Sequence, residues 1–345
     1  MPPSFDSVHN PFLLWSLPMR IRRNLTLALA AALLCAGALP GTAGIALAQG
    51  ADKAPLRIVV PYPPGGSSDR AARLLAEALQ PRLGTPVIVE NIVGAGGRLA
   101  ARQLAGGAAD APVLMLANPA LMVVAPLVFK NNGYEPDRDF QPISQISSYE
   151  FALAVGPAVP VRELNHLLAW IKSNPDKANL GVPATGSLPH FFALMVAQAA
   201  KAPAQVIGYK GSAPLSTDLI GGHVAVAVDT LDTLLPLHEG GKLRILATSG
   251  AKRAVATLPT FKEAGLDISA DGFNVLYARP GMKPEMVEML AREIAAAMLQ
   301  PALREKFSAA KAEPVSASRA QTRAMLERFK AQWLPVIQKA GLQFD

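Results

Sequence analysis

Residues 56–69 read LRIVVPYPPGGSSD and join a short apolar run to a glycine-rich turn. Leu56–Val60 is largely β-branched and apolar, which is typical of a buried strand. Ser68–Leu83 follows with apolar side chains at the spacing of one helix face, so we expect a helix directly after the turn. A strand, a turn and a helix in this order form the repeating unit of α/β proteins.

The same unit recurs along the chain. Further strands are expected at 86–90, 113–117, 178–182, 205–209, 223–228 and 243–248, and further helices at 97–105, 188–200 and 213–220. This alternation predicts an α/β protein with mostly parallel sheets. The last quarter differs, since helices are expected at 283–299, 301–310 and 318–340 with no strand between them.

Composition excludes several classes of protein. Half of the 345 residues are hydrophobic and 17% are charged, which is too apolar for a disordered chain. The 30 prolines argue against a long coiled coil or a helical bundle. After the first fifty positions no stretch approaches the roughly 20 apolar residues of a membrane span, which excludes a polytopic membrane protein. The length is typical of about two domains.

The beginning of the chain has the layout of a targeting segment. A basic group at Arg20–Arg23 precedes an apolar stretch at 25–39, and Ala46–Ala48 places small residues where a signal peptidase cleaves. We therefore expect a signal peptide over 1–48, a mature protein in the periplasm and no lipid anchor. Translation from Met19 would make 1–18 a mis-annotated start, and an uncleaved anchor helix is the alternative to cleavage.

Charge and cysteine content narrow the partners. The segment 1–48 holds Cys35, which is the one cysteine of the chain, so the mature protein has no thiol. Removal of residues 1–48 lowers the net charge from +7 to +5. This weakly basic charge suits small anionic ligands. No run of five or more lysines and arginines occurs, so no nucleic acid is expected as a partner.

Known catalytic and cofactor motifs are missing from the sequence. The four histidines of the mature chain stand alone, so no metal site is expected. Gly94–Gly96 begins like a dinucleotide fingerprint, but Leu99 stands at its third glycine position. The sequence therefore predicts no cofactor and gives no support to an enzyme, which would need a positioned acid, base or nucleophile.

Two glycine-rich turns stand out, each between a strand and a helix. The first spans Pro61–Asp69 and the second Glu90–Arg98. Glycines let a ligand reach backbone N–H groups, and a helix N-terminus favours an anion, so the two turns predict a site for one carboxylate. We expect the backbone to dominate, with β-branched residues at Gly66 or Gly96 costing more affinity than loss of Arg98. Ordinary turn and cap chemistry, with Ser68 and Asp69 as N-caps, is the alternative.

Several motifs resemble one family, in the same order along the chain. They are Ile58–Asp69, Val87–Asn91 with Gly94–Gly97, Gly208–Pro214 with Asp218–Gly222, Gly241–Arg244, and Leu258–Phe261 with Glu263–Gly265. Together they resemble the Bug-type solute-binding proteins of tripartite tricarboxylate transporters, from about Leu56 to the C-terminus.

This resemblance implies a type II periplasmic-binding-protein fold with two α/β lobes and a ligand cleft between them. Residues 52–150 with 275–345 would form lobe 1, and 151–274 would form lobe 2. It further implies a monomeric receptor that captures a small carboxylate or amino-acid ligand and delivers it to a membrane permease. A sensor that feeds a signalling receptor, or an exported carboxylate-processing enzyme, is the alternative.

The resemblance also implies the ligand-binding residues. These are Tyr62, Pro64, Gly65, Gly66, Ser67 and Ser68 in the first turn, Gly94, Ala95, Gly96, Gly97 and Arg98 in the second, and Thr185, Gly186, Ser187, His190, Tyr209 and Asp229 in lobe 2. Three of them have a second interpretation. Arg98 could be a solvated helix-start arginine, His190 could cap a turn, and Asp229 could cap a helix that begins near Thr230 rather than accept a ligand ammonium.

Overall fold

The computed structural model describes residues 54–107, 112–201, 204–341 and 343, and the predicted signal peptide lies outside them. The described residues belong to one compact unit. Within it, no helix is long and apolar enough to cross a membrane.

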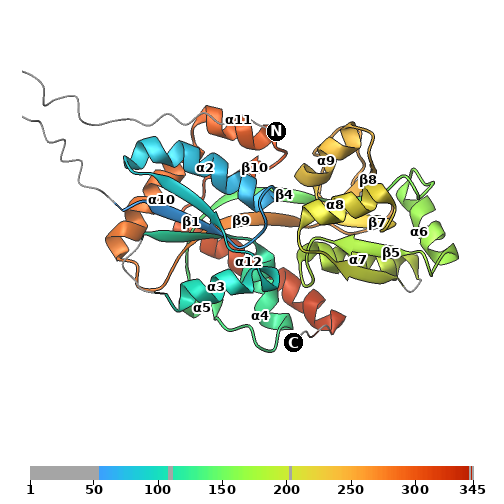
Figure 1. Cartoon of the computed structure of the whole chain (residues 1–345), viewed down its shortest axis with the longest axis horizontal. Coiled ribbons are helices and arrows are strands. Elements are labelled where there is room, and N and C mark those ends of the chain that lie inside the picture. The colour runs from blue at the N-terminus through green and yellow to red at the C-terminus, as the bar shows by residue number, and fades with distance from the viewer. Residues whose placement is uncertain (1–53, 108–111, 202–203, 342, 344–345) are drawn as a thin grey trace, which may run out of the picture. The chain divides into compact units, whose positions relative to one another are not determined.

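Strands of the described residues pair along one path (Figure 1). Their bounds are β1 Leu56–Val60, β2 Val87–Asn91, β3 Val113–Ala117, β4 Gln141–Val155, β5 Asn179–Val182, β6 Gln205–Gly208, β7 Val226–Thr230, β8 Arg244–Thr248, β9 Asp271–Ala278 and β10 Glu313–Pro314. The order is β2-β1-β3-β9-β4-β7-β5-β6, and β8 and β10 also pair with β4.

The prediction of mostly parallel sheets is correct only for the two flanks. Strand β1 pairs in parallel with β2 and β3, and β5 pairs in parallel with β6 and β7. In the middle, β9 pairs antiparallel with β3 and β4, and β4 pairs antiparallel with β7, β8 and β10. Short β10 also corrects the prediction that no strand interrupts the C-terminal helices.

The central strands β4 and β9 were not expected from the sequence, because polar residues such as Ser144, Ser147 and Asn274 interrupt their apolar residues. Strand β4 carries Ser144 and Ser147, both fully buried. The Ser144 hydroxyl donates to the Ala317 carbonyl at 2.8 Å, and the Ser147 hydroxyl accepts from the Asn274 side chain at 3.1 Å. Hydrogen bonds thus make polar side chains acceptable inside the sheet. The predicted lobe boundaries near 150 and 275 fall within β4 and β9. The division into lobes at these positions stays a prediction.

The helices mostly fall where the sequence pattern placed them. They are α2 Ser67–Leu83, α3 Arg98–Ala105, α4 Ala125–Val128, α5 Pro136–Asp139, α6 Leu164–Ser173, α7 Leu188–Ala200, α8 Ser212–Gly221, α9 Leu231–Glu239, α10 Pro284–Met298, α11 Pro301–Ala309 and α12 Arg319–Ala340, with shorter turns η1 Ala95–Gly97 and η2 Ala120–Val124. Local signals set several ends. Pro284 and Pro301 open their helices, Gly84 ends α2 in the left-handed conformation, and Ser318 forms a capping box on α12.

Helices cover both faces of the sheet, and three hydrophobic cores result. One core joins β1 and β3 to α2, α10 and α11, with Ile58, Leu75 and Leu290 among its buried members. A second joins α8 and α9 to β4, β7 and β8. The third and largest lies on the opposite faces and includes Phe151 and Phe192, so it runs under both halves of the strand path. Since β4 contributes to all three cores, it connects the two halves of the strand path (Figure 1).

Candidate ligand-binding site

A cavity of about 850 Å³ opens where the carboxyl ends of β1, β5 and β7 meet loops from both halves of the strand path. Its walls come from residues 61–68, 93–98, 118–129, 183–189, 209–216 and 229–237. Every predicted site residue except His190 lines this cavity. The fold therefore brings together segments that are more than a hundred positions apart in the sequence.

The first glycine turn is held by the side chain of Asp69. Gly65 has φ +83°, a left-handed conformation that favours glycine, and its N–H donates to Asp69 Oδ2 at 2.9 Å. Gly66 is extended at φ −79° and precedes α2 without any side-chain cap. The first-turn N–H groups of α2 therefore have neither intrahelical acceptors nor a capping side chain, and Ser67 and Ser68 of this turn line the cavity.

Asp69 also connects the two glycine turns. Its buried carboxylate accepts from Arg73 at 2.9 and 3.0 Å and from Asn91 Nδ2 at 2.9 Å, and the same amide group donates to the Tyr62 carbonyl at 3.0 Å. Asn91 ends β2, just before the second turn. Burial raises the pKa of Asp69, but hydrogen bonds from Arg73, Gly65 and Asn91 hold it below its ordinary value, so the carboxylate is ionised. Asp69 is thus a structural acceptor and not the N-cap that the sequence suggested.

The second glycine turn contains four consecutive residues with positive φ, from Gly94 to Gly97. Gly97 N–H donates to the Gly94 carbonyl at 2.9 Å, which closes the turn before α3. Ala95 adopts φ +48° despite its Cβ, a conformation that side chains rarely take. At Gly97 an added Cβ would lie 3.1 Å from Pro61, whereas at Gly96 nothing comes closer than 3.9 Å. Backbone conformation, rather than space, therefore requires glycine at position 96.

Arg98 lines the cavity at the start of α3. Its guanidinium lies 3.3 Å from the ring centroid of Phe129, and its buried Nε has no hydrogen-bond partner among the described residues. Burial is the main cause that lowers the pKa of Arg98, yet the group remains a cation. The cation–π contact with Phe129 therefore stabilises the Arg98 cation. Arg98 is thus not the solvated arginine of the alternative interpretation.

The turn before α7 supplies Thr185, Gly186 and Ser187 to the cavity. His190, in contrast, is buried behind this turn, where its Nδ1 accepts the Gly186 N–H at 2.9 Å. Burial lowers the pKa of His190, which favours the neutral ring that this acceptor role requires. The structure thus supports the turn-capping interpretation of His190 and not direct contact with a ligand.

The hydroxyl groups of two tyrosines at the cavity are hydrogen-bonded to other side chains of the protein. Tyr62 donates to Asn118 Oδ1 at 2.6 Å, and Tyr209 donates to Asp218 Oδ2 at 2.9 Å. Burial, followed by the Asp218 carboxylate, raises the pKa of Tyr209 to about 12. Both side chains therefore shape the cavity while their hydroxyl groups bond within the protein.

Asp229 is the penultimate residue of β7, lines the cavity and is 1% exposed. Its Oδ1 accepts the Thr230 N–H at 2.7 Å, but no hydrogen bond of normal geometry reaches Oδ2. Burial is the main cause that raises the pKa of Asp229 to about 7, and Ser212 and the Thr230 N–H oppose the shift in part. Helix α9 begins at Leu231 with no side-chain cap on Thr230, so the predicted helix cap by Asp229 does not form.

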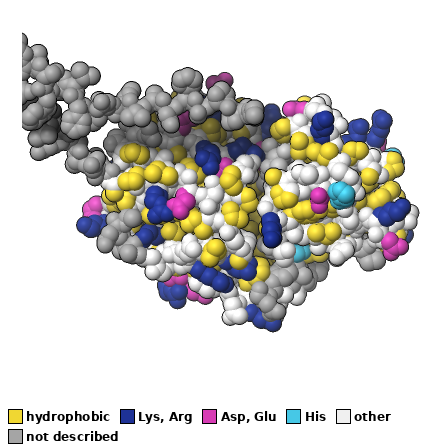
Figure 2. All heavy atoms as spheres, in the orientation of Figure 1, with side chains coloured by type: hydrophobic (Ala, Val, Ile, Leu, Met, Phe, Trp, Pro, Cys, Tyr) yellow, Lys and Arg dark blue, Asp and Glu magenta, His cyan; other side chains and the backbone are white. Residues whose placement is uncertain are grey.

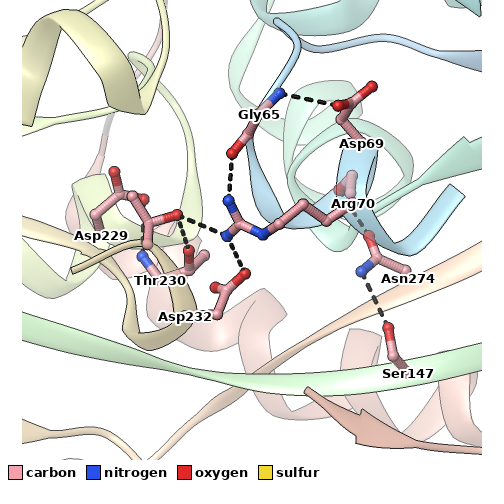
Figure 3. Close-up of polar contacts among 10 residues, drawn as sticks. Gly65, Asp69, Arg70, Ser147, Asp229, Thr230, Asp232 and Asn274 are labelled. Atoms are coloured by element: carbon pink, nitrogen blue, oxygen red, sulfur yellow. Dashed lines mark hydrogen bonds and ion pairs between the residues drawn. The ribbon is translucent and has the colours of Figure 1, made fainter. Parts of the chain in front are cut away.

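Arg70 was not recognised from the sequence, yet it lines the cavity and its side chain reaches Asp232 (Figure 3). From α2 its guanidinium donates to the Gly65 carbonyl and to Asp232 Oδ2 at the start of α9, and it lies 3.2 Å from Thr233 Oγ1. Asp232 has a side chain that is 2% exposed, against 35% for Arg70. We call this contact the Arg70–Asp232 bridge. The sequence gives no signal for it, because the two residues are 162 positions apart.

The described part of the chain was also searched for a metal-binding cluster. Within it, no group of three or more histidine, cysteine or acidic side chains is arranged to hold a metal ion. On the face shown in Figure 2, lysines and arginines are scattered among acidic, hydrophobic and neutral side chains.

Comparison with known proteins assigns the family. The family described as "Tripartite tricarboxylate transporter family receptor" matches residues 71–342. The chain belongs to this family. Protein BugT of Bordetella pertussis is 33% identical over 307 residues, which cover 87% of this chain and 94% of BugT.

Solved structures of the same kind share the fold. The periplasmic binding protein BugD superposes with a TM-score of 0.78 at 29% identity, covering 84% of this chain and 98% of BugD. The R. palustris protein Rpa4515, solved with adipate, gives a TM-score of 0.80 at 30% identity, covering 84% and 97%. These findings confirm the predicted Bug-type family and the two-lobed periplasmic-binding-protein fold of this tripartite tricarboxylate transporter receptor.

Proposed function

We propose that this receptor works in the periplasm, binds a small carboxylate-containing ligand in the 850 Å³ cavity and delivers it to a tripartite tricarboxylate transporter permease. The observation that carries the proposal is the placement of the α2 start, which has no capping side chain, and of the positive-φ turn Gly94–Gly97 at the cavity wall. Unpaired N–H groups and the positive end of a helix favour a carboxylate. Adipate in Rpa4515 is a ligand of this class, which supports the same chemistry here.

Binding without turnover fits the side chains at the cavity. His190 is occupied by the Gly186 N–H, and the Asp229 carboxylate interacts with the Thr230 N–H and with the Ser212 hydroxyl. The two carboxylate networks of α2 and α9 are neutralised by Arg73 and Arg70. The cavity therefore has room for a ligand, while most of these polar side chains form hydrogen bonds and ion pairs within the protein.

The test begins with thermal unfolding of the purified protein in the presence of mono-, di- and tricarboxylates. A ligand at a hundred times its Kd stabilises a protein by about 2.7 kcal/mol, so a true ligand raises the melting temperature clearly. Calorimetry and recovery of the unchanged ligand then separate binding from catalysis. Uptake of that ligand into vesicles that contain the permease should require the added receptor. Carboxylates that produce no shift, or a recovered ligand that is chemically altered, would contradict the proposal.

A further inference from the structure

Asn274 is a completely buried amide on the central strand β9. Its Oδ1 accepts a hydrogen bond from the Ser68 hydroxyl at 2.6 Å, and its Nδ2 donates to Ser147 Oγ on β4 at 3.1 Å (Figure 3). Asn274 and Ser147 stand opposite each other in the β4–β9 pair, while Ser68 belongs to the first turn of α2. These hydrogen bonds therefore connect the start of α2 with both central strands.

The lengths of the two contacts show how the protons are arranged. The 2.6 Å contact has the length of a hydroxyl donor, and the 3.1 Å contact has that of an N–H donor. An amide oxygen has no proton to give, so the hydroxyl of Ser68 is the donor. Ser68 lines the cavity, yet its proton is directed at a side chain in the protein interior.

The contact with Asn274 affects which groups at the start of α2 remain open to an anion. A serine close to a helix start can hydrogen-bond to nearby main-chain N–H groups, and such a bond competes with a ligand for them. The start of α2 has no side-chain cap, and the Ser68 hydroxyl is bonded to Asn274 instead. The first-turn donors are thus left for a carboxylate.

We propose that Asn274 is a positioning residue for carboxylate binding. It holds Ser68 against the central strands and so keeps the first turn of α2 in place at the cavity wall. This inference rests on the proposed receptor function and adds a buried residue that acts on the ligand only through Ser68. The competing interpretation is that Asn274 only satisfies polar groups between β4 and β9 and contributes to stability alone.

Calorimetric titration of Asn274→Ala separates the two interpretations. The probe is whichever of succinate, adipate and citrate binds the wild-type protein most tightly. We expect its Kd to rise about tenfold, which corresponds to about 1.4 kcal/mol. The melting temperature should fall by about 2–4 °C because buried hydrogen bonds are lost.

Ser144→Ala is the matched control. It also removes a buried hydrogen bond of β4, but one that leads to the Ala317 carbonyl and not to α2. Its melting temperature should fall by a similar amount, while the Kd stays within about twofold of wild type. Circular dichroism verifies that each variant is folded. If Asn274→Ala does not fold, Ser68→Ala must by itself show the tenfold rise in Kd.

A double-variant cycle tests whether Asn274 acts through Ser68. Ser68→Ala should raise the Kd about as much as Asn274→Ala does, and combining them should add no more than about twofold, because the contact is already lost. An unchanged Kd in Asn274→Ala, or a full tenfold effect of this change in the Ser68→Ala background, would overturn the inference and leave the receptor function standing. If none of the three carboxylates binds the wild-type protein, the proposed function is wrong and the inference with it.

Discussion

Two walls of the cavity present different groups to the same ligand. The glycine-turn wall, around residues 61–68 and 93–98, offers main-chain N–H groups whose direction is set by positive φ angles. The side-chain wall, around 209–216 and 229–233, offers Ser212, Asp229 and Thr233. Main-chain donors exist in any sequence that adopts the turns, whereas side chains differ from one protein to the next. In the function that we propose, the first wall recognises the common carboxylate and the second selects among carboxylate ligands.

Gly96→Val should break the glycine-turn wall and have the largest effect. Valine at φ +65° is strained by its β-branched side chain, so the turn must shift its N–H groups. We expect the Kd measured by calorimetry to rise about a hundredfold, equal to about 2.7 kcal/mol. Arg98→Ala should raise it less, about threefold to tenfold, since a cation–π contact of ordinary strength is lost.

Gly66 provides the matched control, because its backbone does not adopt the positive φ of Gly96. At φ −79° it has ordinary backbone geometry, and an added Cβ would lie 3.8 Å from the Pro63 carbonyl. Gly66→Ala should therefore bind within about threefold of wild type, which is less than 1 kcal/mol.

Normal binding by Gly96→Val with loss of binding by Arg98→Ala would show that a side-chain salt bridge holds the carboxylate.

The Arg70–Asp232 bridge joins the two walls, and its removal should have the next largest effect. Arg70→Ala leaves a buried acid without its cation, and we expect the free energy of unfolding to fall by about 2 kcal/mol because Arg70 is partly exposed. The rate of ligand dissociation in stopped-flow experiments should rise about tenfold through the loss of the Gly65 contact.

A double variant sharpens this test. Arg70→Ala with Asp232→Ala removes both charges, so urea unfolding should show it more stable than Arg70→Ala alone. Equal destabilisation of the single and double variants would mean that the bridge is not an energetic unit.

Glu150 lies on β4, the strand shared by both halves. Its ionisation should make the free energy of unfolding depend on pH. Burial, followed by repulsion from Asp271 across the β4–β9 pair, raises the pKa of Glu150 from 4.5 to about 7. The folded state therefore binds more protons than the unfolded state in this range, and the free energy of unfolding falls as pH rises from about 4.5 to about 7. Glu150→Gln should reduce that fall by about 1–2 kcal/mol, given partial solvent access.

Urea unfolding at several pH values measures the effect of Glu150→Gln. Asp271 and Asp229 also have raised pKa values and should leave a residual slope of the same sign. A variant whose pH dependence equals that of the wild type would show that Glu150 titrates normally in the folded protein.

Tyr209→Phe should have the smallest effect on binding. Its hydroxyl is bonded to Asp218, so the ring shapes the side-chain wall and the oxygen does not face the ligand. Affinity should change less than about threefold, and stability should fall by about 1 kcal/mol from the lost hydrogen bond. A tenfold loss of affinity would place the hydroxyl on the ligand instead.

Local patterns in the sequence determined the flanking strands, most helices and both glycine turns. Leu56–Val60 and Ser68–Leu83 could be assigned because periodicity, prolines and glycines act over a few neighbouring residues. The family motifs then gave candidate site residues that all line the cavity except His190, since homologous turns occupy homologous positions in a fold. His190 was left with two interpretations, because a histidine that accepts a turn N–H reads the same as one that contacts a ligand.

Tertiary structure alone decided what depends on distant partners. Strand β4 is buried despite Ser144 and Ser147 because Ala317 and Asn274, far along the chain, satisfy their hydroxyl groups. The same holds at the cavity, where Arg70 meets Asp232 across 162 positions. Which charges remain unpaired depends on the distances between side chains in the folded protein, and a sequence pattern of a few residues contains no information about those distances.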